Sequence, residues 1–158
     1  MRHVGIVIVD RGAAIVAVER HEDGRIVVTG IERLPFDLGA VAARVRELDL
    51  EHPGSRSVVD AEGLGQALWA VLGKAKDRPW HLYQGRGLER QALVDELLVA
   101  VEEDRFRFMG GLAEQDAMNK ALVTYRRQVR DDGLIGSELV VALLLALYRD
   151  LTPRPDIH

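Results

Sequence analysis

The sequence predicts an α/β domain in which helices cover both faces of a mixed sheet of about five strands. Three observations predict this class. The first 34 residues contain three apolar, β-branched segments separated by turn signals, as in an antiparallel meander. A helix and another strand follow, a step that normally joins parallel strands through a right-handed crossover. The second half of the chain then supplies three helical stretches that can cover the sheet.

The N-terminal part reads as three strands. His3–Asp10 is almost wholly apolar, as in a central strand that is buried on both faces. The other two expected strands are Ala13–His21 and Arg25–Leu34. Arg11-Gly12 and Glu22-Asp23-Gly24 are turn signals between them, so consecutive strands should be antiparallel.

The middle of the chain alternates between helices and strands. Leu38–Leu50 has apolar residues at helical spacing, which predicts an amphipathic helix. Ser57–Asp60 is a short apolar strand that leads into a glycine loop. Gln66–Lys76 then reads as a second helix and Trp80–Gln84 as a further strand.

The C-terminal half reads as helical. The expected helices are Leu88–Asp104, Ala113–Arg130 and Ser137–Asp150. Residues 105–108 alternate between arginine and phenylalanine, which is typical of a short edge strand. We expect residues 1–151 to form one domain and residues 152–158, which carry two prolines, to form a flexible tail.

Composition excludes several classes of protein. The 158 residues carry a net charge of −4 and 47% apolar residues, which is ordinary for a globular domain. The absence of cysteine excludes a disulfide scaffold and a thiolate metal site. The longest apolar run, Leu139–Tyr148, is far shorter than the roughly 20 residues of a membrane span. Asp10 and Arg11 interrupt any signal-peptide pattern, so we expect a soluble, cytoplasmic protein.

Three acidic residues are the candidate catalytic and metal-binding groups. Asp10 ends the first strand, Asp60 ends the fourth, and Glu138 begins a helix that is apolar almost all round. If the first and fourth strands are parallel neighbours, their carboxyl ends bring Asp10 and Asp60 together, and a helix packed on the sheet can bring Glu138 there. Clustered carboxylates repel unless a cation neutralises them, and hard oxygen ligands suit Mg²⁺ or Mn²⁺. Two such ions, about 4 Å apart, can clamp a phosphodiester.

Each of these acids also has an ordinary structural explanation. An aspartate at the end of a strand is often a turn or cap residue, which applies to Asp10 and Asp60. The helix dipole favours Glu138 near a helix N-terminus in any case. What favours a site is the joint position of all three. Other acids, which are more readily explained as solvated, are Glu62, Asp131 and Asp132.

Arginines are the candidate contacts to nucleic acid. Arginine outnumbers lysine 18 to 3, and its planar fork suits phosphate. Arginines cluster at three places, Arg86 and Arg90, Arg105 and Arg107, and Arg126, Arg127 and Arg130. The predicted contacts are the first and last of these clusters. A cluster of basic residues on a helix is also common on an ordinary solvent-exposed face. The prediction that these arginines bind nucleic acid therefore depends on the three acids forming a nuclease site.

The order of these segments and acids resembles the ribonuclease H-like fold, and more narrowly the nuclease domain of phage large terminase subunits. Residues 57–72 are similar to that family's strand, acid, glycine loop and helix. Residues 90–101, the strand at 105–108 and the helix with Leu122 and Tyr125 also follow the family. Residues 136–146 resemble its closing helix, whose first turn carries a metal-binding acid. The resemblance spans nearly the whole chain.

The resemblance implies that Asp10, Asp60 and Glu138 hold two divalent ions, Mg²⁺ or Mn²⁺, that cut DNA. The first hypothesis is therefore a metal-dependent endonuclease that grips the DNA backbone without reading sequence, with a separate packaging ATPase as its partner. A second hypothesis is a Holliday-junction resolvase, which requires a dimer with two sites. A third is an inactive ribonuclease H-like module that serves binding or packaging.

Overall fold

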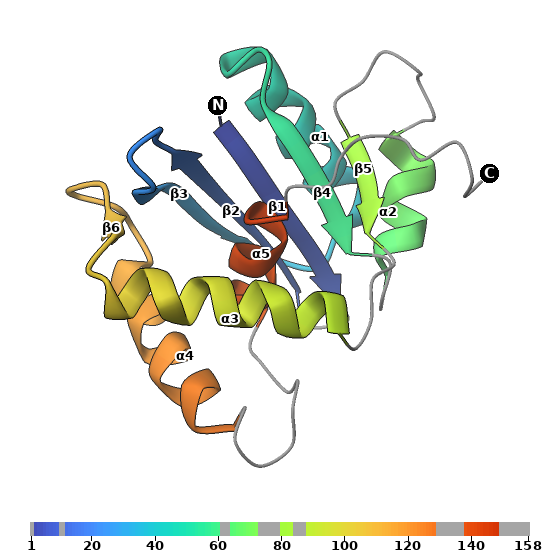
Figure 1. The fold of residues 1–158 in the computed structure, drawn as a ribbon. Helices are drawn as coiled ribbons and strands as arrows, with labels where there is room; N and C mark the ends of the chain where they lie inside the picture. The colour runs from blue at the N-terminus through green and yellow to red at the C-terminus, as the bar shows by residue number, and fades with distance from the viewer. Residues whose placement is uncertain are drawn as a thin grey trace, which may run out of the picture.

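A computed structural model describes residues 2–9, 12–60, 64–72, 80–83, 88–128 and 138–148; for residues 80, 88–91 and 124–128 it describes the backbone alone. Figure 1 shows a twisted sheet between two layers of helices. The strands are β1 (Arg2–Val9), β2 (Gly12–Arg20), β3 (Ile26–Leu34), β4 (Arg56–Asp60), β5 (Trp80–Tyr83) and β6 (Phe106–Phe108). The helices are α1 (Leu38–Glu51), α2 (Gly65–Leu72), α3 (Leu88–Glu102), α4 (Gln115–Gln128) and α5 (Glu138–Ala146).

The sheet is mixed, and the strand order is β5-β4-β1-β2-β3-β6. The antiparallel meander is confirmed, since β1 pairs with β2 and β2 with β3 in antiparallel register. The parallel pairing of β1 with β4 is also confirmed, with Gly5 opposite Val58 and Ile6 opposite Val59. The sixth strand is the short segment expected at the edge, because Phe106–Phe108 pairs in parallel with the start of β3.

Strand alternation divides the core between the two faces of the sheet. On one face, Ile6 and Ile8 of β1 pack against α1 and α2. On the other, Val7 of β1 and Val16 of β2 pack against α3, α4 and α5. The prediction of helices on both faces is therefore confirmed (Figure 1).

The helix α5 is the centre of the second layer. From Leu139 to Ala146 its residues are buried, apart from a partly buried Val141. It packs across β1, β2 and β4. Its close approach to β1 requires Gly5, because a Cβ there would lie 1.8 Å from the Ala142 carbonyl oxygen.

Two helices end earlier than the sequence predicts. The expected α3 reaches Asp104, but the helix ends at Glu102 because Asp104 adopts a left-handed conformation with φ 60° and the Arg105 N–H returns to the Ala100 carbonyl at 2.8 Å. The expected α5 reaches Asp150, whereas the last residue in helical conformation is Ala146. The tail expected at 152–158 lies outside the described residues. Within the part of the chain that is described, the helices are too short or too polar to span a bilayer.

Candidate functional site

Asp60 is the buried acid at the end of β4. It is 4% exposed and pairs in register with Tyr83 of β5. Val58 packs on the α5 side of the sheet and Val59 on the opposite side, so alternation turns Asp60 towards the α5 side. Burying a carboxylate is costly unless other groups compensate its charge, which makes this position unusual for a simple turn residue.

The chain that follows Asp60 folds back tightly against it. A Cβ at Gly65 would lie 1.4 Å from the Asp60 carbonyl oxygen, so only glycine fits at the first residue of α2. The Leu64 N–H donates to the Ile8 carbonyl at 3.2 Å. The start of α2 is thus held against the carboxyl ends of both β1 and β4. Asp60 does not cap α2, because the helix begins five residues later, after Leu64.

Glu138 lies towards the same end of the sheet as Asp60. The opposite end of α5 is fixed by Arg20, whose Nη2 donates to the Leu147 carbonyl. Arg20 follows Glu19, which pairs with Arg2 at the amino end of β1. Between these limits, Gly5 in β1 faces Ala142 of α5. Glu138, the half-buried first residue of α5, therefore lies at the end of the helix that is farther from the amino end of β1 and nearer to the carboxyl ends of β1 and β4.

The third candidate acid, Asp10, lies outside the described residues. So do the less favoured acids Glu62, Asp131 and Asp132. Among the side chains that are described, no group of three or more histidine, cysteine, aspartate or glutamate residues is placed to hold a metal ion. The structure thus brings Asp60 and Glu138 to one end of the sheet.

The side chains of the candidate phosphate-binding arginines are not among those that the structure describes. Arg86 and Arg130 lie outside the described residues. Arg90 is on α3, and Arg126 and Arg127 are on the last turn of α4, where only the backbone is described.

His81 of β5 forms a group of three aromatic rings with two tyrosines, Tyr83 and Tyr148. Its ring stacks on Tyr148 with ring centres 5.9 Å apart, and Tyr148 meets Tyr83 edge-on at 4.9 Å. Burial lowers the pKa of the His81 imidazole, because the charged form loses water.

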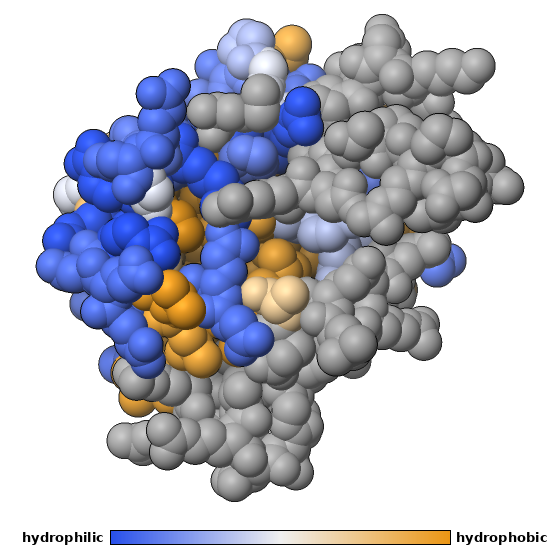
Figure 2. All heavy atoms as spheres, in the orientation of Figure 1, coloured by the Kyte–Doolittle hydropathy of each residue, from blue (hydrophilic) through white to orange (hydrophobic). Residues whose placement is uncertain are grey.

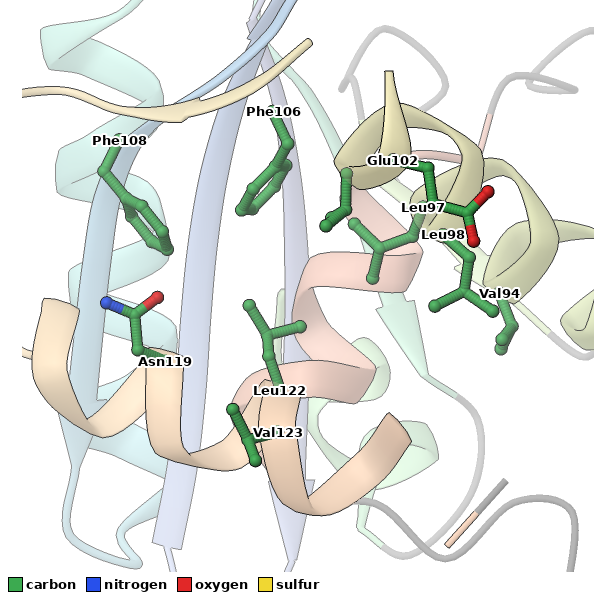
Figure 3. Close-up of a pocket in the computed structure, with 10 residues that line it drawn as sticks. Val94, Leu97, Leu98, Glu102, Phe106, Phe108, Asn119, Leu122 and Val123 are labelled. Atoms are coloured by element: carbon green, nitrogen blue, oxygen red, sulfur yellow. The ribbon is translucent and has the colours of Figure 1, made fainter. Parts of the chain in front are cut away.

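A pocket elsewhere in the molecule was not expected from the sequence. It has a volume of about 450 Å³ and lies between α3, β6 and α4 (Figure 3). Its walls are almost entirely apolar. The alternation of Phe106 and Phe108 on β6 was the available signal, since it places both rings on one face of an edge strand.

Comparison with known proteins finds solved structures with a similar fold. No protein-family model matches the chain, and no curated protein matches its sequence. The nuclease domain of the large terminase from bacteriophage SPP1, solved with bound Mn, superposes with a TM-score of 0.62 at 13% identity. That match covers 92% of this chain and 84% of the other.

The human cytomegalovirus terminase nuclease domain, Mn soaked and inhibitor bound, matches with a TM-score of 0.60 at 13% identity. Here 93% of this chain and 81% of the viral chain are covered. Both likenesses extend over nearly the whole chain. The chain therefore has the ribonuclease H-like fold seen in terminase nuclease domains.

Proposed function

We propose that this chain is a DNA endonuclease that requires two divalent cations, Mg²⁺ or Mn²⁺, held by Asp10, Asp60 and Glu138. The observation that carries the proposal is the burial of Asp60 at the carboxyl end of β4, with Glu138 directed to the same end of the sheet. Asp10 follows Val9, the last residue of β1, whose neighbour in the sheet is β4. The two neighbours of the same fold that were solved with Mn give independent support.

The donor set fits a hard cation. Asp60 and Glu138 offer carboxylate oxygens, the ligands that Mg²⁺ and Mn²⁺ prefer. When bound, the ions would activate the attacking water and stabilise the leaving oxygen of a phosphodiester.

The chain's own residues position these oxygens. Gly65 holds the start of α2 against the Asp60 carbonyl, which fixes the end of β4. Gly5 lets α5 press against β1, which fixes the depth of Glu138. The N-termini of α2 and α5 carry partial positive charge that offsets part of the repulsion between the acids.

DNA would be held through its backbone by Arg86, Arg90, Arg126, Arg127 and Arg130. The chain as a whole carries a charge of −4, so binding must depend on a local basic surface. We expect weak binding without sequence preference that falls steeply between low and moderate salt, because phosphate contacts release counterions. A gel-shift titration at two salt concentrations tests this, and an affinity that ignores salt would contradict it.

The natural setting that fits such a nuclease is phage DNA packaging in the host cytoplasm, with a packaging ATPase as a separate partner. The fold is shared with terminase nuclease domains, which supports this setting. A Holliday-junction resolvase is the alternative, and it would form a dimer with two symmetric cuts. Sedimentation of the purified chain separates the two.

The test is Mn²⁺-dependent nicking of a supercoiled plasmid. The wild type should nick and linearise the plasmid, and Asp10→Asn, Asp60→Asn and Glu138→Gln should each lower the rate by about a hundredfold or more. Glu22→Gln is the matched control, because Glu22 is an exposed acid in the turn after β2 and should leave the rate unchanged. Circular dichroism would confirm that each variant is folded.

Two outcomes would change the proposal. A wild type that does not cut with any divalent ion would move the proposal to the inactive binding or packaging module. Full cleavage by Glu138→Gln would show that the third ligand is Glu62, Asp131 or Asp132, or that two acids suffice.

A further inference from the structure

The pocket between α3, β6 and α4 has the form of a groove between two helices. Figure 3 shows the side chains of Phe106 and Phe108 from β6, those of α3, and Leu122 and Val123 from α4 surrounding one common space. Its volume of about 450 Å³ is within the range of ligand-binding pockets, about 300–1,000 Å³. Two polar groups, Glu102 and Asn119, line an otherwise apolar wall.

The apolar surface continues out of the pocket onto both helices. Val101 on α3 is 42% exposed and Val123 on α4 is 54% exposed, and both line the pocket. Figure 2 shows an apolar patch over these helices with hydrophilic residues above and beside it. A small molecule inside the cavity would cover only the part of each valine that faces the cavity. A helix laid along the groove would cover them, because side chains at i, i+3 or i+4, and i+7 follow one face.

The negative charge at the edge of the pocket indicates which kind of helix would bind there. Glu102, Glu103 and Asp104 are consecutive acids at the C-terminal end of α3, where the helix dipole disfavours negative charge. Two of them have cations: Arg105 donates to Glu103 at 3.0 Å and Arg107 to Asp104 at 2.6 Å.

Glu102, the acid that lines the pocket, pairs with no cation among the side chains that the structure describes. An occupant that brings a lysine or arginine to Glu102 would supply the missing charge. A nucleic-acid backbone would be repelled there.

We propose that this groove binds an amphipathic helix of a partner protein, with apolar anchors in the pocket and a basic side chain next to Glu102. The groove lies away from the candidate nuclease site, because β6 pairs with the start of β3, near the amino end of the sheet's parallel strands. Docking there would leave the carboxyl ends of β1 and β4 accessible. The inference does not depend on the chain being a nuclease.

The probes for this proposal are a pair of synthetic helical peptides of about 17 residues. The basic peptide carries leucines at i, i+3 and i+7 with flanking lysines; its acidic twin carries glutamates in place of the lysines. Fluorescence anisotropy measures binding to the full chain. The basic peptide should bind saturably, and the acidic twin should bind at least about tenfold more weakly because it meets Glu102 with like charge.

Variants of the chain locate the site. Val101→Glu should weaken binding of the basic peptide about tenfold, since it puts a carboxylate in the apolar contact. Glu102→Gln should weaken it about threefold and flatten its salt dependence, as expected for one exposed ion pair. Val99→Glu is the matched control: Val99 is on the same helix, is 44% exposed, and does not line the pocket. It should bind like the wild type.

Three results would overturn the proposal. One is equal binding of the basic and acidic peptides. Another is equal loss in Val99→Glu and Val101→Glu, which would indicate a different surface. The third is a wild-type dimer in sedimentation that Val101→Glu dissociates and the basic peptide does not, because the occupant would then be a second copy of the chain. Plasmid nicking is read in the same samples, so failure of the nuclease proposal remains distinguishable.

Discussion

Replacing Gly5 by alanine should force β1 and α5 apart. The new Cβ would lie 1.8 Å from the Ala142 carbonyl oxygen and 2.8 Å from the Ala146 nitrogen. Protein Cβ atoms essentially never come closer than 3.0 Å to such atoms, so one backbone must move by at least 1.2 Å, the difference between 1.8 and 3.0 Å. Neither contact is with a flexible side chain, and α5 is buried along nearly its whole length.

The expected loss of unfolding free energy is about 3 kcal/mol or more, at the upper end of the usual 1–3 kcal/mol for overpacking, because a rigid helix cannot yield locally. For a chain of this size that corresponds to a melting temperature lower by roughly 6–12 °C. The assay is guanidinium unfolding followed by circular dichroism.

Gly30→Ala is the matched control for this substitution. Gly30 is also a strand glycine, but its Cβ would meet Ala17 at 3.6 Å and Arg2 at 3.8 Å, which are ordinary contacts. That variant should equal the wild type or gain up to about 1 kcal/mol from a less flexible unfolded chain. Gly5→Ala unfolding within about 0.5 kcal/mol of the wild type would refute the reasoning, since α5 would then have room to move.

Three further predictions follow from particular contacts. Arg20→Met should lose about 2–3 kcal/mol of unfolding free energy, because it removes a part-buried ion pair with α3 and a hydrogen bond to the end of α5; Arg25→Met, in an exposed pair, should lose less than about 0.5 kcal/mol. Gly65→Ala should displace Asp60 and lower the rate of plasmid nicking along with the melting temperature. Burial lowers the pKa of His81 below its unfolded value of about 6.5, so its contribution to stability is complete above about pH 6.5 and declines as the pH falls further. The midpoint of denaturant unfolding, measured between about pH 7.5 and 5.5, should therefore fall less with decreasing pH in His81→Asn than in the wild type. An identical pH profile for the two proteins would contradict this prediction.

The pairings among β1, β2, β3 and β4 could be predicted because the hydrophobic pattern and the turn signals specify them. The apolar run of β1 requires cover on both faces, and the hairpin at Glu22-Asp23-Gly24 sets the antiparallel pairing of β2 with β3. The helix–strand step then returns β4 parallel to β1. The burial of α5 follows in the same way from a helix that is apolar almost all round.

Other features depend on packing that sequence periodicity does not record. The glycine at position 5 carries no periodic signal, although it decides how closely α5 approaches the sheet. The end of α3 depends on the left-handed backbone of Asp104, a conformation more typical of glycine. The pocket arises from the spacing of α3 and α4 over β6, which no single segment determines.

The candidate site was predictable only in part, because its geometry also depends on packing that the sequence pattern does not record. Asp60 and Glu138 could be assigned to one end of the sheet from topology, because strand direction and helix direction follow from the element order. The distance between the two carboxylates depends on side-chain geometry that topology does not determine. The place of Asp10 in this site remains a prediction.

The most direct measurement is anomalous X-ray diffraction at the manganese edge from crystals of the chain soaked in Mn²⁺. The proposal predicts two peaks about 4 Å apart at the carboxyl ends of β1 and β4, each within coordination distance of Asp60, Glu138 or Asp10. Crystals of Asp60→Asn soaked in the same way should lose at least one peak. A fully soaked wild-type crystal with no manganese at these carboxylates, or with manganese only at other surface acids, would contradict the metal-dependent nuclease.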